Sequence, residues 1–230
     1  MVGEPLERRV REPEPGAARP PLVLLMHGYG SNEEDLLALA SAWPGLRVVS
    51  ARGPLELGPG AYAWFGFRGP ALEVEAAGFL EALGRLERLF DELCERYAPG
   101  RRQVVVGGFS QGAMMAAALA LRRPAQVGAL LMMSGRLPPE ELLEAARAPG
   151  AGAAPAPGKG RARPLEGLEA LLTHGREDPL IPPSEAERTR DRLEALGAHV
   201  TLRLYAMGHQ VNEEAAEAVS AWLRTLREMA

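Results

Sequence analysis

Q-V-V-V-G-G-F-S-Q-G, residues 103–112, is the stretch that decides the fold we predict for this chain of 230 residues. Its apolar, β-branched run predicts a buried strand, and the alanine-rich and methionine-rich residues from Gln111 to Arg122 predict a helix. Between the two, Gly108–Gly112 has the form G-x-S-x-G. Glycines suit such a turn because the strand and the helix pack too closely there for larger side chains. The stretch therefore predicts a nucleophile elbow that exposes Ser110.

Along the rest of the chain, short apolar runs alternate with helical patterns, which is typical of a parallel sheet covered by helices on both faces. The predicted strands are Leu22–Met26, Leu46–Ala51, Gln103–Gly107, Val127–Met133, Leu168–His174 and His199–Tyr205. The predicted helices are Glu33–Ala42, Leu72–Tyr97, Gln111–Arg122, Ser184–Leu196 and Asn212–Met229, with a short helical patch at Pro138–Arg147. We therefore predict one α/β-hydrolase domain over residues 1–230, with a mostly parallel sheet and no large cap domain.

Two segments do not fit this alternation of strands and helices. Residues 1–20 are rich in Glu, Arg and Pro and lack the apolar core of a signal peptide. Residues 148–164 are almost entirely Ala, Gly and Pro, which cannot bury a core, so they predict a flexible surface insertion within the domain.

Composition and charge exclude several classes of function. The net charge of -4, without a basic tract, argues against a nucleic-acid partner, and no apolar run is long enough for membrane insertion. The single cysteine, Cys94, fits a reducing compartment, so we expect a cytoplasmic protein in which Cys94 is a core thiol. No cluster of His, Cys and carboxylates has metal-site spacing, so we expect neither a metal nor another cofactor. The oligomeric state stays open, with a homodimer among the options.

A serine hydroxyl is a poor nucleophile near neutral pH, so Ser110 needs an imidazole as general base and a carboxylate that orients it. In this fold the order along the chain is serine, acid, histidine. Of the histidines after Ser110, His199 begins an apparent strand and suits a half-exposed sheet position. His209 lies in a glycine-containing loop between the last strand and the last helix, where a base can face the elbow. We therefore predict His209 as the base.

The acid has three candidates between the serine and the histidine. Asp191 falls in a charged helical stretch, where a solvated face is the better interpretation. Asp178 and Glu177 share the loop that leaves the strand Leu168–His174. We favour Asp178, because its short side chain directly precedes the rigid Pro179 and has fewer rotamers to lose than Glu177.

Ester cleavage also needs hydrogen-bond donors for the oxyanion of the tetrahedral intermediate. One donor in this fold is the backbone amide after the nucleophile, here Gln111, and another comes from an early loop. The run His27-Gly28-Tyr29-Gly30 leaves the first predicted strand, which makes the Tyr29 amide the second candidate. His27 itself is interpreted as a structural residue that fixes this loop.

Candidates for an acyl pocket come from a loop and from the helix after the elbow. Trp64 and Phe65 lie in a glycine-flanked loop near a strand end, where pocket lining and plain packing are both open interpretations. Met114 follows the elbow, where ordinary core filling is the stronger interpretation.

Five motifs, in this order, resemble the phospholipase/carboxylesterase family, which includes the acyl-protein thioesterases. They are L-L-M-H-G-Y-G-S-N-E-E-D-L (24–36), A-W-F (63–65), G-G-F-S-Q-G-A-M (107–114), H-G-R-E-D-P-L-I-P (174–182) and M-G-H-Q-V (207–211). The resemblance implies triad roles for Ser110, Asp178 and His209, and oxyanion roles for Tyr29 and Gln111. The insertion and the loop Gly53–Gly69 depart from the family pattern.

The expected function is hydrolysis of short to medium acyl esters through an acyl-enzyme, with a small-molecule ester or thioester as substrate. Acyl thioesterase or lysophospholipase activity on the same triad is the alternative within this class. A binding protein that has lost catalysis is the alternative outside it, and it would usually lack a triad residue, whereas here each position is filled.

Overall fold

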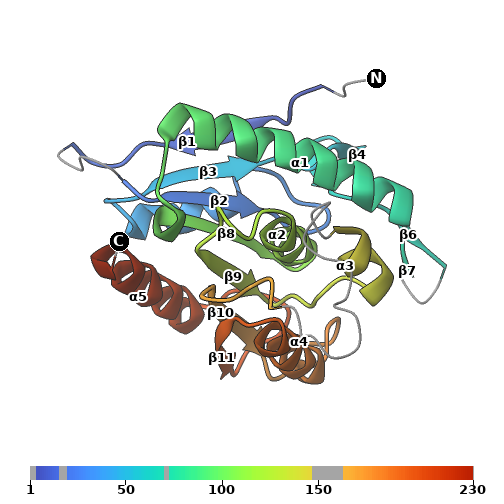
Figure 1. The fold of residues 1–230 in the computed structure, drawn as a ribbon. Coiled ribbons are helices and arrows are strands. Elements are labelled where there is room, and N and C mark those ends of the chain that lie inside the picture. Colours follow the sequence, from blue (N-terminus) through green and yellow to red (C-terminus); the bar gives the residue numbers. More distant parts are fainter. Residues whose placement is uncertain (1–3, 16–19, 70–72, 147–162, 230) are drawn as a thin grey trace, which may run out of the picture.

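A computed structural model of the chain describes residues 4–15, 20–69, 73–146 and 163–229. Within this described part, a seven-stranded sheet runs through the molecule in the order β1-β3-β2-β8-β9-β10-β11 (Figure 1). β1 pairs antiparallel with β3, and all the other neighbours are parallel. The bounds are β1 Arg8–Arg11, β2 Leu22–Met26, β3 Arg47–Ala51, β8 Val104–Phe109, β9 Ala129–Met133, β10 Glu169–Gly175 and β11 His199–Tyr205.

Helices cover both faces of this sheet, as predicted (Figure 1). On one face lie α1 (Ala76–Tyr97), α2 (Gln111–Arg122), α3 (Glu140–Ala146) and α4 (Pro183–Ala195). On the other face lie the 3-10 helix η1 (Leu36–Ala42) and α5 (Glu213–Met229). A further 3-10 turn, η2 (Arg101–Gln103), precedes β8.

Burial on both faces explains the uninterrupted apolar strands. All five residues of β2 are buried, with Leu24 facing the core under α1 and α2, and Leu25 facing the core under η1 and α5. The long helix α1 contributes one apolar stripe at steps of three and four residues, which is the period of a helix face. Its buried residues are Phe79, Ala82, Leu83, Leu86, Leu89, Phe90 and Leu93.

Several elements differ from the sequence-based expectation. β1 was not predicted, because its sequence R-R-V-R has a single apolar residue and an edge strand needs only one neighbour. The helix expected from Leu72 begins at Ala76, because Glu73–Val74 (β7) pairs instead with Phe67–Arg68 (β6). The helix expected from Glu33 is a 3-10 helix that begins at Leu36.

The segment expected to be a loop at residues 53–69 contains a small hairpin of its own, formed by β4 (Leu55–Gly58) and β5 (Ala61–Ala63). Gly60 makes its turn with a φ of +74°, a conformation that glycine adopts readily. The expected insertion at 148–164 lies outside the described residues apart from its last two positions.

The closest backbone approach in the sheet region joins β2, β8 and α2. A Cβ atom added at Gly112 would lie 2.0 Å from the Met26 carbonyl oxygen, and one added at Gly108 would lie 2.4 Å from the Gly112 carbonyl carbon. Backbone atoms of three elements thus occupy the space that a side chain would need. Both glycines of the elbow are required by packing.

We expect Gly112→Ala to destabilise the protein by about 1–3 kcal/mol or more, because the new methyl group overlaps backbone that cannot move aside. Gly84→Ala is the matched control, since its Cβ would have no neighbour nearer than 3.9 Å in the middle of α1. That variant should gain up to about 1 kcal/mol from helix propensity. Urea unfolding of the two variants measures both effects, and equal stability of the two would contradict this account of the elbow.

Candidate active site

Ser110 stands at the elbow between the end of β8 and the first turn of α2. Its φ of 53° and ψ of -113° lie outside the regions that side-chain-bearing residues prefer. Its amide donates a 2.9 Å hydrogen bond to the Met133 carbonyl at the end of β9. Strained backbone of this kind collects at functional sites, where the surrounding structure holds it.

The structure brings the three residues predicted as a triad together. Ser110 Oγ lies 2.9 Å from His209 Nε2, and His209 Nδ1 lies 2.7 Å from Asp178 Oδ2. With Nδ1–H donating to the carboxylate, Nε2 is left to accept from the serine hydroxyl. His209 belongs to the loop after β11, and its ring packs on Phe109 with the centroids 4.9 Å apart. The three side chains can therefore pass a proton from the serine to the imidazole.

Asp178 is held by the backbone of its own loop. Its Oδ1 accepts hydrogen bonds of 2.9 Å from the amides of both Leu180 and Ile181. Burial alone raises the pKa of Asp178, but the Ile181 amide, the His209 ring and the Leu180 amide outweigh it, so the pKa lies below the ordinary aspartate value. The carboxylate is thus kept ionised while it faces the imidazole.

A second histidine, His174 at the end of β10, steadies this loop. Its Nε2 donates a 2.8 Å hydrogen bond to the Ile181 carbonyl and lies 3.5 Å from Asp178 Oδ2. Sequence reasoning gave His174 no role. The sequence feature that could have indicated this role is the place of His174 at a strand end, four residues before Asp178.

The rejected candidates lie where the sequence reasoning put them. The Glu177 side chain is exposed, Asp191 pairs with Arg190 at 2.7 Å on α4, and His199 is exposed at the start of the edge strand β11. Cys94, expected to be a core thiol, is only partly buried, and burial raises its pKa to about 11.

The two predicted oxyanion donors also lie at this edge of the sheet. Tyr29 follows β2, and the amide of the next residue, Gly30, donates to the Tyr62 carbonyl at 2.8 Å. In the described part of the chain, no hydrogen bond is found for the Tyr29 amide. Gln111 is the first residue of α2, and the first amides of a helix have no partner within it. The oxyanion roles of Tyr29 and Gln111 stay predictions.

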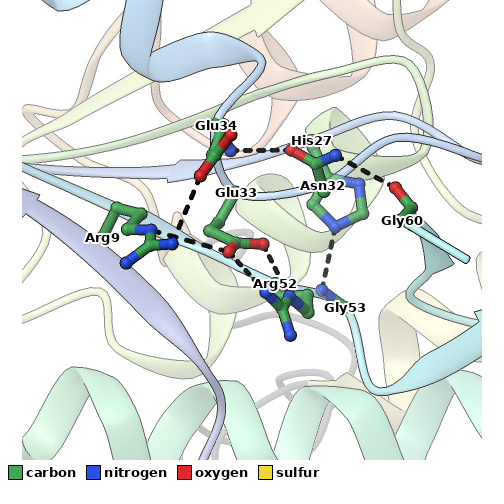
Figure 2. A network of polar contacts seen from close by, with 8 residues as sticks. All are labelled: Arg9, His27, Asn32, Glu33, Glu34, Arg52, Gly53 and Gly60. Carbon is green, nitrogen blue, oxygen red and sulfur yellow. Dashed lines mark hydrogen bonds and ion pairs between the residues drawn. The ribbon is translucent and has the colours of Figure 1, made fainter.

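His27 has the structural position that the sequence predicted. Its Nδ1 donates to the Gly28 carbonyl at 2.7 Å. Its Nε2 accepts from the Gly53 amide at 2.9 Å (Figure 2). Burial, the largest effect, lowers the pKa of His27. A neutral ring with one donor and one acceptor is what these two partners require.

Next to His27, an ion pair between the buried Glu33 and the partly exposed Arg52 fixes the same loop (Figure 2). The Glu33 carboxylate accepts from Arg52 Nε at 2.6 Å and from Arg52 Nη2 at 2.5 Å, and Arg9 Nε lies 3.8 Å away. The hydrogen bond from Arg52 lowers the pKa of Glu33. Asn32 extends the network by donating to the Gly60 carbonyl at 3.0 Å. The sequence analysis missed this network, whose partners come from β1, the loop after β2, the residue after β3 and the turn between β4 and β5.

The three proposed pocket residues lie in the core. Trp64 and Phe65 are each 1% exposed, and Met114 is 3% exposed. Phe65 packs edge-on against Phe79 of α1, with the ring centroids 5.3 Å apart. All three side chains are therefore buried, and a role in lining an acyl pocket stays a prediction.

A serine on a nucleophile elbow, followed along the chain by an aspartate and a histidine at the carboxyl edge of such a sheet, is typical of α/β-hydrolase-fold proteins. The chain belongs to the phospholipase/carboxylesterase family, whose sequence pattern matches residues 10–227. It is 24% identical to MhqD of Bacillus subtilis, which is named as a hydrolase, over 88% of this chain and 92% of that protein. It is 26% identical to acyl-protein thioesterase 1 of Schizosaccharomyces pombe, over 73% of each chain.

Solved structures agree with this assignment. Esterase PE8 is 28% identical and superposes with a TM-score of 0.77 over 97% of this chain and 100% of its own. The Bacillus cereus carboxylesterase, at 24% identity, has the same fold, with a TM-score of 0.75 over 96% of this chain and 94% of its own. The predicted α/β-hydrolase fold and family are thus confirmed, and the chain is a hydrolase-family enzyme of the esterase or thioesterase type.

The described residues contain no group of three or more His, Cys, Asp or Glu side chains arranged to hold a metal ion. None of their helices combines the length and the apolar character that crossing a bilayer requires.

The lowered pKa of His27 predicts a pH dependence of stability. Because the folded pKa lies below the unfolded value of about 6.5, the unfolded chain binds more protons as the pH falls. The His27 contribution is therefore complete above about pH 6.5 and is lost as the pH falls through the folded pKa, with a slope of up to about 1.4 kcal/mol per pH unit. Urea unfolding between pH 5 and 8 should show this slope in the wild type.

His27→Gln keeps an acceptor for the Gly53 amide but does not titrate, so its stability should fall less on acidification. His199→Gln, at an exposed position, is the control and should keep the wild-type slope. Parallel curves for the wild type and His27→Gln would refute the burial account.

Proposed function

We propose that this protein is a serine hydrolase that cleaves carboxylic esters of short to medium acyl chains through an acyl-enzyme on Ser110. The observation that carries the proposal is the continuous contact from Ser110 Oγ to His209 and on to Asp178, at 2.9 and 2.7 Å. These distances are those of hydrogen bonds that prepare a serine for attack.

In the proposed reaction, His209 Nε2 takes the hydroxyl proton while Ser110 Oγ attacks the ester carbonyl carbon. The amides of Tyr29 and Gln111 hold the oxyanion of the tetrahedral intermediate. When the intermediate collapses, the alcohol leaves with the proton from His209. Water then attacks the acyl-enzyme with His209 as base, the carboxylic acid leaves, and Ser110 regains its proton. Throughout, the Asp178 carboxylate stabilises the imidazolium and does not itself take the proton.

Two observations bear on the substrate, which we propose is a small ester. Between the end of β9 and the start of β10, the only helix among the described residues is the seven-residue α3, so this part holds no large helical cap. The names of the relatives also include both carboxylesterases and acyl-protein thioesterases. A thioester is therefore the second candidate substrate, because the same triad can attack either carbonyl.

The proposed function is tested by hydrolysis of p-nitrophenyl esters from acetate to long acyl chains, alongside one acyl thioester. We expect the wild type to turn over the short and medium esters. Ser110→Ala should remain folded and lose about 10³-fold or more in kcat, since only binding and the oxyanion donors remain. A fluorophosphonate should modify Ser110 alone, as mapped by mass spectrometry. Modification at another residue, or a wild type that binds these esters without cleaving them, would overturn the proposal in favour of another nucleophile or a binding protein.

The role of the acid is tested by comparing neighbouring carboxylates. Asp178→Asn keeps the shape of the side chain but favours the wrong histidine tautomer, so kcat should fall on the order of 10⁴-fold, as in the serine proteases. Glu177→Gln is the matched control, because the Glu177 side chain is exposed, and it should change kcat little. If Glu177→Gln were the inactive variant, the acid would have to be reassigned.

A further inference from the structure

The side chain of Gln111 makes contacts that the proposed reaction does not use. Its Oε1 accepts a 2.8 Å hydrogen bond from the Trp64 amide, and its Nε2 donates a 2.8 Å hydrogen bond to the Phe65 carbonyl. Gln111 is only 2% exposed, so these two bonds are made away from water. One side chain thus fastens the start of α2 to two consecutive peptide groups of a segment 46–47 residues away in the sequence.

Trp64 continues this connection to the loop after β2. Its indole Nε1 donates a 3.0 Å hydrogen bond to the His27 carbonyl. The ring centroids of Trp64 and His27 lie 5.7 Å apart. The His27 carbonyl is two residues before Tyr29, which carries the second amide proposed to bind the oxyanion. The hydrogen bonds therefore run from Gln111 through Trp64 to the Tyr29 loop.

We propose that the side chains of Gln111 and Trp64 are positioning residues that set the separation of the two oxyanion amides. Gln111 would then act twice, with its backbone amide toward the oxyanion and its side chain toward the backbone of Trp64 and Phe65. The inference rests on the proposed esterase function, since it concerns the geometry of the transition state of that reaction.

The physical reason is the short range over which an oxyanion donor is effective. A donor stabilises the intermediate only when it lies about 2.7–3.1 Å from the oxygen that becomes negative. Tyr29 and Gln111 belong to different elements, and Tyr29 is 52% exposed, so its own side chain is not anchored in the core. Fixing both amides to the buried Trp64 keeps them at one distance before substrate arrives.

The chemistry of the glutamine amide suits this position. Trp64 offers a donor and Phe65 offers an acceptor, and an amide is the neutral side chain that satisfies both. Methionine has a similar length but replaces neither bond. Glutamate would accept from Trp64 but would place a carboxylate against the Phe65 carbonyl.

The experiment measures kcat and KM of Gln111→Met on a short p-nitrophenyl ester, with enzyme concentration taken from fluorophosphonate titration. A role in positioning predicts that kcat per active site falls about 10–100-fold while KM changes by less than about 3-fold, because the oxyanion forms only in the transition state. A role in stability alone would lower the melting temperature and the fraction of titratable sites, but not kcat per site.

Trp64→Phe tests the second half of the connection, because phenylalanine keeps an aromatic ring but lacks the indole N–H. Its kcat per site should also fall, and the double variant should lose less than the product of the two single effects, since both act on one connected set of contacts. Trp43→Phe is the matched control. Trp43 is also a buried residue, and its indole donates to Ser220 Oγ at 2.8 Å, on the face of the sheet covered by α5. That variant should keep kcat per site within about 2-fold of the wild type.

Unchanged kcat per site in Gln111→Met or in Trp64→Phe would overturn the inference, and so would multiplicative effects in the double variant. These outcomes leave the proposed function intact, because the wild type would still hydrolyse the ester. A wild type with no activity on esters or thioesters would instead refute the proposed function, and the inference with it. If Gln111→Met does not fold, Trp64→Phe and Trp43→Phe alone decide the matter.

Discussion

The contact on which the rest of the site depends is the close approach of three backbones at the elbow. Gly112 leaves no room for a Cβ atom beside the Met26 carbonyl, and Gly108 leaves none beside Gly112. Because β2, β8 and α2 meet without side chains between them, Ser110 is raised above the sheet with a backbone conformation that the chain would not adopt freely. The same approach brings the start of α2 next to the end of β2, where the two oxyanion amides are expected.

Around this contact, hydrogen bonds join the ends of strands that are far apart in sequence. His209 after β11 reaches Ser110 after β8 and Asp178 after β10, and Ser134 after β9 donates to the Gln210 carbonyl at 3.1 Å. Parallel strands place their carboxyl ends at one edge, so short loops suffice to gather these groups. The fold thereby positions the side chains before a substrate binds.

The sequence predicted the features that depend on local pattern. Runs such as Leu22–Met26 are apolar throughout because they are buried on both faces, so the strands could be predicted from the sequence. The elbow could be predicted too, because the glycines of the G-x-S-x-G turn allow its geometry. The strand Arg8–Arg11 could not, since its charged sequence has no strand pattern and it lies in the sheet through pairing with its one neighbour, β3. The Gln111 and Trp64 side chains show the same limit. Their partners are set by the tertiary path of the segment after β5, and nothing in the periodicity of either segment specifies it.

Two histidines at the same edge of the sheet show how surroundings decide a residue's role. Both ring nitrogens of His27 bond to backbone groups, and its burial disfavours the charged form, so it has neither a free nitrogen nor a counter-charge in contact with its ring. His209 has side chains as partners on both nitrogens, one of them the ionised Asp178, and its side chain is 15% exposed. An imidazole that must gain and lose a proton needs a carboxylate that stabilises its charged form and a partner that gives up a proton. Of these two histidines only His209 meets both conditions, and this difference, rather than position in the sequence, separates the proposed base from the structural residue His27.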